Sequence, residues 1–298
     1  MKSHLHLPTG SQFVAATLVS LAILLATGMK SRATDSPPPP LFTSISVTNG
    51  QVSLAWSNGV PTYQVQRCVA LDQPWQNVGA PTNVTSVTFP QVGDQAYYRV
   101  IADFTARYIV TFNATWSQAT HPSNWPANPH FSGLVGGTHN DSVHFYRVGE
   151  TASEGIRLMA ELGQKPVLLN EVAAAITNGT AQLQLNGGGI NPSPGSVFHY
   201  FPQPMRRDFP LVSLVSMIAP SPDWFVGVDS LSLLDNGQWA TNKTVSVFGM
   251  DAGTDSGVSY SSPDQATVPR GVVTEFTDFP ALVNGVIVPF GTFTFTRY

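Results

Sequence analysis

Three aspartates in the C-terminal half are the residues best suited to chemistry. Asp251 and Asp255 enclose an Ala-Gly-Thr tripeptide, in which Gly253 permits a sharp turn that can direct both carboxylates inward. Asp223 lies in a Pro-Asp-Trp sequence, at a turn where a strand is expected to end. Calcium binds six to eight oxygens, and carboxylates supply the charge. Aspartates in turns also accept hydrogen bonds from backbone N–H groups, and the spacing alone favours this second role.

Histidines raise the question of zinc. His121, His130, His139 and His144 lie close together in the chain, but their spacing fits none of the usual zinc patterns and no cysteine accompanies them. His121 precedes a proline and His130 follows one, so we expect both to hold loop backbone in place.

Catalytic side chains are less evident. Glu154, Glu161 and Glu171 fall in a region of helical pattern, where nothing marks two of them as a facing glycosidase pair. Ser213 and Ser216 lie in an apolar strand without the Gly-x-Ser-x-Gly turn of a hydrolase. We therefore expect a binding protein and not an enzyme. A calcium-supported hydrolase is the least favoured alternative.

The composition is that of a turn-rich, mostly β protein with room for two domains. The chain has 298 residues, of which 42% are hydrophobic and 11% charged, with 25 Gly and 24 Pro. Its net charge is −4 and it has no basic cluster, which excludes nucleic acid as a partner. Cys68 is the only cysteine, so no intramolecular disulfide can form and extra stability must come from packing or from metal.

The N-terminus has the pattern of an export signal. Lys2 precedes an apolar run over 13–26 that is short for a membrane span, although an uncleaved anchor is the alternative. We expect a signal peptide over 1–33, cut after Gly28 or Ala33, and a secreted or periplasmic protein. A cut after Ala33 leaves 11 basic and 18 acidic residues, a formal charge of −7.

A stiff proline-rich linker is expected over 34–40, followed by a small β module over 41–103. Asn49-Gly50 separates two alternating runs and is a strong hairpin signal. The order of Val-x-Leu-x-Trp, Tyr-x-Val-Gln-Arg and Tyr-Tyr-Arg-Val resembles a shortened fibronectin type III module. We expect a structural, accessory role for it.

A second domain is expected over 106–298. It begins with a strand at Tyr108 and continues with two helices, over 150–162 and 167–177. Gly163 stands where a helix cap is expected after the first helix. The strand pattern then returns at Ala181, Leu211, Val245 and Gly291.

Two long blocks of this domain are similar to the spondin N-terminal domain family. They are Ser-Met-Ile-Ala-Pro-Ser-Pro-Asp-Trp-Phe-Val-Gly-Val-Asp-Ser-Leu over 216–231 and Asp-Ala-Gly-Thr-Asp-Ser-Gly over 251–257. Shorter matches lie over 112–140 and 152–161, so the resemblance covers about residues 106–298. It implies an antiparallel β-sandwich, related to calcium-dependent membrane-binding domains, with two helices inserted.

The resemblance also implies a site for one calcium ion, held by Asp223, Asp251 and Asp255. A further acidic ligand of some members has no counterpart here. Its role would fall to Asp208 or to a backbone carbonyl.

For the ligand surface, Trp224 and Phe225 beside the calcium loop and the basic pair Arg206-Arg207 are the candidates. Core packing is the more common role of such aromatic residues. Family members of this kind occur in extracellular matrix proteins, where the domain serves attachment and recognition. The resemblance thus implies a secreted calcium-binding adhesion or ligand-recognition module whose partner is a protein or a glycan.

Calcium-dependent binding to a membrane or an anionic polysaccharide is the alternative. The absence of paired cysteines and the short accessory module are more typical of a bacterial protein.

Overall fold

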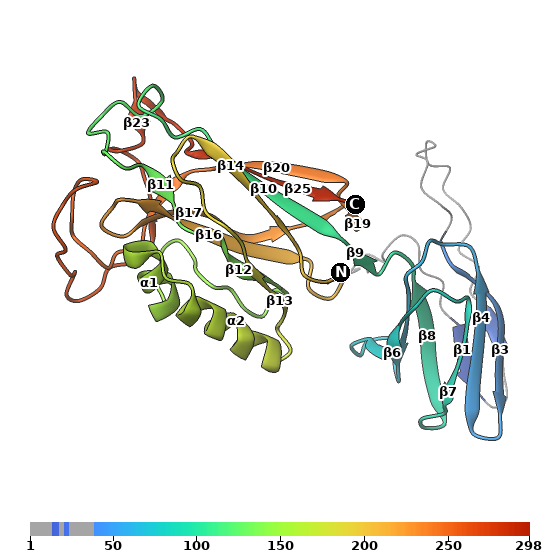
Figure 1. The fold of residues 1–298 in the computed structure, drawn as a ribbon. Helices are drawn as coiled ribbons and strands as arrows, with labels where there is room; N and C mark the ends of the chain where they lie inside the picture. The colour runs from blue at the N-terminus through green and yellow to red at the C-terminus, as the bar shows by residue number, and fades with distance from the viewer. Residues whose placement is uncertain (1–13, 18–20, 24–38) are drawn as a thin grey trace, which may run out of the picture. The chain divides into compact units, whose positions relative to one another are not determined.

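The computed structural model describes residues 14–17, 21–23 and 39–298. The chain divides into two compact units, one ending at Thr105 and the other running from Ala106 to Tyr298 (Figure 1). The expected start of the second domain, residue 106, is the first residue of the second unit.

The first unit consists of two antiparallel sheets. One has the order β3-β4-β7, and the other has the order β2-β1-β8-β5-β6. Asn49 and Gly50 both have positive φ and join β3 to β4 in the predicted hairpin. Buried residues of both sheets, among them Leu54, Trp56 and Tyr98, share one apolar core. The strands are β1 (Val14–Thr17), β2 (Leu21–Ile23), β3 (Leu41–Thr48), β4 (Gln51–Ser57), β5 (Tyr63–Cys68), β6 (Gln76–Thr82), β7 (Ser86–Pro90) and β8 (Gln95–Ile101).

Most of the expected signal peptide and linker, residues 1–40, lies outside the described residues. The described parts are β1 and β2, of which β1 pairs with β8, and residues 39–40. Cleavage after Gly28 or Ala33 therefore stays a prediction.

The second unit is an antiparallel sandwich. Its first sheet has the order β14-β10-β25-β20, formed by β10 (Tyr108–Ala114), β14 (Gly195–Tyr200), β20 (Asn242–Val247) and β25 (Gly291–Arg297). Its second sheet has the order β13-β12-β16-β17-β21-β22, with β11 beside β16. These strands are β11 (His130–Phe131), β12 (Val135–His139), β13 (Ala181–Asn186), β16 (Leu211–Ala219), β17 (Trp224–Ser232), β21 (Gly249–Asp251) and β22 (Thr274–Glu275).

Short strand pairs complete the unit. They are β9 (Thr105–Ala106) with β15 (Met205–Arg206), β18 (Leu234–Asp235) with β19 (Gln238–Trp239), and β23 (Leu282–Val283) with β24 (Val286–Ile287).

Two helices cover the outer face of the second sheet, over β12, β13 and β16 (Figure 1). Helix α1 (Glu154–Leu162) is capped at its N-terminus by Ser153, whose hydroxyl accepts a hydrogen bond from the Ile156 N–H. It ends at Gly163, whose φ of 65° is the left-handed cap expected there. Helix α2 (Pro166–Thr177) begins one residue before the predicted start, with proline in its first turn, where its fixed φ suits a helix.

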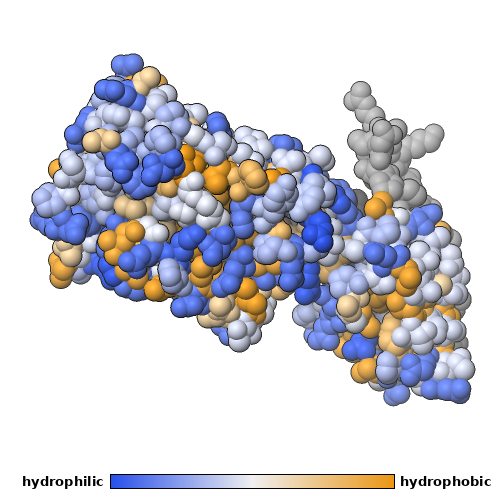
Figure 2. Space-filling view, in the orientation of Figure 1, coloured by the Kyte–Doolittle hydropathy of each residue, from blue (hydrophilic) through white to orange (hydrophobic). Residues whose placement is uncertain are grey.

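Two apolar cores hold the unit together. Alternate residues of β10 and β25, including Phe112, Phe293 and Phe295, face β16 and β17 between the sheets. A second core lies under the helices and includes Ile156, Met159 and Val172. The expected all-β sandwich with two inserted helices is thus confirmed. Figure 2 shows its viewed surface as mostly hydrophilic, with smaller hydrophobic groups between.

Candidate cation site and adjoining pocket

The three predicted calcium aspartates lie at one end of the second sheet. Asp223 immediately precedes β17, and Asp251 is the last residue of β21. The two strands pair with Trp224 opposite Asp251, so the two aspartates are brought together at the same edge. Asp255 follows four residues after Asp251, in a loop whose backbone N–H groups bind the Asp223 carboxylate.

Asp223 is fully buried and serves as an acceptor for the neighbouring loop. Its Oδ2 accepts hydrogen bonds from the Thr254 N–H at 2.6 Å, the Thr254 hydroxyl at 3.2 Å and the Asp255 N–H at 3.0 Å. Its other oxygen, Oδ1, is buried without a hydrogen-bond partner. A buried carboxylate oxygen left unpaired is costly, and a cation or a proton is the partner that would satisfy it.

The other two aspartates bind backbone N–H groups, as turn aspartates do. Asp251 accepts from Gly253 at 2.7 Å, while Asp255 accepts from Gly257 and from Gln265, each at 2.7 Å. Gly253 has a φ of +73°, and a Cβ there would lie 2.7 Å from the Val272 carbonyl oxygen. The turn role favoured by spacing is therefore present. It leaves the second lone pairs of these oxygens available to a cation.

The electrostatics of this cluster favour a bound positive charge. Burial raises the pKa of Asp223 to about 6, and the nearby Asp251 charge adds to the effect, against the hydrogen bonds from Thr254 and Asp255. Burial also raises the pKa of Asp251, opposed by the Gly253 N–H. Both carboxylates are thus short of positive partners.

In the described part of the chain, no group of three or more His, Cys, Asp and Glu side chains is gathered closely enough to hold a metal ion. In this arrangement a cation would take fewer than three of the aspartates. Calcium accepts carbonyl and water oxygens beside carboxylates, so the unpaired Asp223 oxygen and its neighbour Asp251 fit such an ion.

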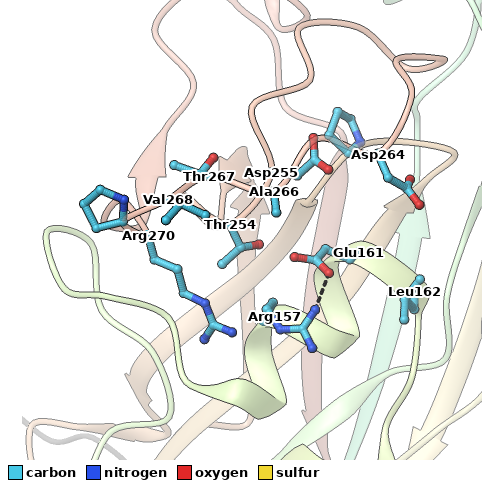
Figure 3. A pocket seen from close by; sticks show the side chains of 12 residues that line it. Arg157, Glu161, Leu162, Thr254, Asp255, Asp264, Ala266, Thr267, Val268 and Arg270 are labelled. Atoms are coloured by element: carbon cyan, nitrogen blue, oxygen red, sulfur yellow. Dashed lines mark hydrogen bonds and ion pairs between the residues drawn. The ribbon is translucent and has the colours of Figure 1, made fainter.

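A cavity of about 360 Å³ adjoins these aspartates. Arg157, Glu161 and Leu162 of α1 line one side, and Pro222, Thr254 and Asp255 line another. The remaining wall is the segment 264–270. Figure 3 shows Arg157 and Glu161 projecting from α1, with Arg270 reaching toward them from that segment. Thr254 and Asp255 therefore belong both to the pocket wall and to the loop held by Asp223.

The charged groups around the pocket are largely paired. Arg157 contacts Glu161 and Glu154, each at 2.5 Å, and Arg270 contacts Glu154 at 2.9 Å. The two arginines lower the pKa of Glu154 to about 2 through these hydrogen bonds. Sequence reasoning missed this pocket, because its walls are joined by tertiary contacts such as the Asp255–Ala266 bridge and the Arg270–Glu154 ion pair.

The structure corrects the expectation for Trp224 and Phe225. Both are buried, Trp224 against Tyr260 and Phe276, and Phe225 against Tyr146. They belong to the core, because the first residues of β17 point their rings into the sandwich and under the helices. Neither ring is available to a ligand.

Asp208 and the Arg206-Arg207 pair lie away from the aspartate cluster. They precede the first residue of β16, whereas Asp223 follows its last residue by four positions. A nine-residue strand spans about 30 Å, so Asp208 cannot complete a cation site at Asp223. Arg206 pairs with Asp208 and covers the Phe209 ring at 5.4 Å.

The four histidines are engaged separately. His130 contacts the Asn128 carbonyl and His144 contacts Glu150, at 2.8 and 2.7 Å. His121 contacts Thr120 at 3.0 Å. His139 is buried, with its Nε2 2.8 Å from the Ser213 hydroxyl.

The Ser213–His139 pair is a nucleophile-and-base combination that sequence reasoning missed. The two residues belong to β16 and β12, whose pairing is not readable from the chain. Both are buried, and burial lowers the pKa of His139. Ser213 also accepts a hydrogen bond from the Ser230 N–H at 2.9 Å, so the pair works as a polar link between strands.

Comparison with known proteins assigns the second unit to a protein family. The family model Spondin_N matches residues 106–282. Human Spondin-2 is 37% identical over 177 residues, which is 58% of this chain and 53% of that protein. Bovine Spondin-1 is 33% identical over 203 residues, or 64% of this chain and 24% of that protein.

The chain thus spans about half the length, or less, of these relatives. The match of the family model covers more than half of the chain, within the unit that carries the aspartate cluster and the pocket. The chain belongs to the Spondin_N family.

Proposed function

We propose that this protein is a secreted adhesion or ligand-recognition module in which calcium has a structural role. The buried, unpaired Oδ1 of Asp223 beside Asp251 is the observation that carries the proposal. A divalent cation would supply the partner that this oxygen lacks, and hard oxygen ligands suit calcium. Asp223 and Asp251 would hold it, with Asp255 close by.

Calcium would act through the loop that forms the pocket wall. Asp223 accepts the N–H groups of Thr254 and Asp255 through its other oxygen. A cation at Oδ1 keeps this carboxylate ionised, which strengthens those hydrogen bonds. The pocket between α1 and the loop would then be held in one shape, ready for a protein or glycan ligand.

Membership of the Spondin_N family supports an extracellular role. No helix in the described residues is long and apolar enough to span a membrane. The N-terminal apolar run supports export, to the outside or to the periplasm, and the small first unit would be a fibronectin type III-like accessory of a bacterial protein. A binding role and not catalysis is part of the proposal.

Titration calorimetry with calcium tests the cation site. Asp223→Asn and Asp251→Asn are expected to weaken calcium binding at least tenfold, and Asp255→Asn to weaken it less. Asp264→Asn is the matched control, because Asp264 lines the same pocket from an exposed position. Equal affinity in wild type and all four variants would refute the assignment.

Calcium-dependent membrane binding is the second candidate. It is favoured by Val258 and Val268, which are 79% and 88% exposed in the segment between β21 and β22. Sedimentation with phosphatidylserine vesicles in calcium would support it if Val268→Asp reduced binding and Val286→Asp, an exposed valine of β24, did not. Equal sedimentation with and without calcium would exclude it.

A further inference from the structure

The outer face of the sheet β14-β10-β25-β20 carries an ordered set of side chains. Inward residues of these strands, such as Phe112 and Phe293, belong to the core, so the alternate residues face away from it. The register places Phe198, Thr111, Thr294 and Thr244 in one row across the four strands. Tyr200, Ile109, Thr296 and Asn242 form the next row.

Three aromatic rings are exposed at the β14 side of this face. Phe198, Tyr200 and Tyr298 are 60%, 53% and 58% exposed. Their rings touch in sequence, with centroids 5.7 Å apart from Phe198 to Tyr200 and 5.5 Å apart from Tyr200 to Tyr298. Within residues 39–298 only one other aromatic residue, Phe248, is exposed among the large apolar side chains. Gathering three of four such rings on one surface indicates a binding role.

The rest of the face is neutral and rich in hydroxyl groups. Its outward positions within the four strands hold Thr, Ser and Asn, apart from Ile109, and no charged residue. One exposed basic residue, Arg107, lies at the edge of the face just before β10, opposite Tyr298. The Thr244 and Thr294 hydroxyls lie 3.0 Å apart, and the Asn242 amide donates to the Thr296 hydroxyl at 3.2 Å. These bonds fix the hydroxyls while leaving further donors and acceptors for a ligand.

We propose that this face binds a neutral saccharide. Neighbouring rings of the cluster meet edge to face, at 84° and 85°, so their faces point in different directions. A sugar ring presents C–H groups on its own faces, which the electron-rich face of an exposed ring in this cluster attracts. Its hydroxyls match the Thr and Asn side chains of the neighbouring strands. The strands of this face carry no charge, and the single arginine at its edge, Arg107, is too little positive charge to hold an anionic polymer or a lipid surface, so a neutral partner fits better. The site is separate from the aspartate cluster and acts without calcium.

Electrophoresis of the full chain in native gels containing a neutral polysaccharide tests the proposal. Mannan, dextran, galactan and β-glucan are the probes, with alginate as the anionic contrast. At least one neutral probe is expected to slow the protein. The triple variant Phe198→Ala, Tyr200→Ala, Tyr298→Ala should raise the apparent Kd for that probe at least tenfold.

Three further variants separate stacking from other effects. Tyr200→Trp keeps a ring and should keep the retardation, and Phe248→Ala removes an exposed ring outside the cluster and should leave it unchanged. Asp223→Asn is expected to bind like wild type, so failure of the cation site and failure of this face are distinguishable. Folding is checked by circular dichroism. Retardation by none of the neutral probes, equal retardation by alginate, or full binding by a folded triple variant would overturn the proposal.

Discussion

At the scale of single residues, Asp223 ties stability to pH. Its pKa of about 6 in the folded, metal-free protein lies above the ordinary value of 3.8, chiefly because of burial. Between these values the unfolded chain has lost the proton that the folded chain keeps. Below about pH 4 the protonated carboxyl of Asp223 therefore contributes about 3 kcal/mol to the free energy of unfolding. This contribution is lost as the pH rises to 6.

We expect metal-free protein in chelator to show this loss in urea unfolding. Asp223→Asn should lack the corresponding slope, because its amide oxygen can still accept the Thr254 and Asp255 N–H groups without charge. At pH 7 in chelator the variant should be at least as stable as wild type, and in calcium the order should reverse. An unchanged pH slope in the variant would contradict this account.

Gly253 is the second residue with a measurable consequence. Its positive φ and the 2.7 Å approach of the Val272 carbonyl oxygen leave no room for a side chain. Gly149 also has a positive φ, of +88°, but nothing lies within 4 Å of its added Cβ. Gly253→Ala should therefore lower the free energy of unfolding by about 2–3 kcal/mol and Gly149→Ala by about 1 kcal/mol. Equal losses of unfolding free energy in the two variants, measured in urea, would contradict this prediction. They would show that the neighbouring backbone moves to make room for a Cβ at position 253.

At the scale of elements, α1 depends on a side chain of α2. Glu171 accepts hydrogen bonds from the Ser153 hydroxyl and the Gly155 N–H, each at 2.7 Å, at the N-terminus of α1. These are charge-assisted bonds to groups that a helix start leaves unpaired. Glu171→Ala should lower the free energy of unfolding by about 2 kcal/mol. The exposed neighbour Asn170 is the control. If Asn170→Ala lowers the free energy of unfolding as much as Glu171→Ala, the effect comes from a change in helix propensity and not from the lost hydrogen bonds.

The sequence predicts these elements well and their juxtaposition poorly. Both helices end where the sequence predicts, because Gly163 and Asn178-Gly179 stop them through local backbone preferences. The first begins at Glu154 and not at 150, since Ser153 supplies the cap. Whether Asp223 faces Asp251 depends on the pairing of β17 with β21, which is a tertiary contact. The same limit hid the pocket beside α1, and it left open whether Trp224 packs in the core or faces a ligand.

At the scale of the whole molecule, calcium is expected to act on stability. Cys68 is the only cysteine, so no disulfide within the chain shares this task. Free calcium at about 100 times its Kd adds about 2.7 kcal/mol to the native state. In a unit of this size each kcal/mol raises Tm by about 2–4 °C, so chelator should lower Tm by roughly 5–11 °C.

Differential scanning calorimetry on the full chain measures this shift. Asp223→Asn should respond little to chelator, and Asp264→Asn should respond like wild type. A Tm of metal-stripped wild type that calcium leaves unchanged would remove the structural role proposed for the ion.

The pairing of β10 with β25 also determines how the second unit carries mechanical force. The two strands are antiparallel, with Tyr108 opposite Arg297, and the Tyr298 N–H bonds to the Arg107 carbonyl. The chain thus enters this unit and reaches residue 298 at the same corner. Tension between residues 105 and 298 would pull the two strands apart from that corner, breaking their hydrogen bonds one after another. Tension between residue 105 and a ligand on the outer face would be shared by the hydrogen bonds of several strands. The unit should therefore withstand more force when pulled through such a ligand than when pulled through residue 298.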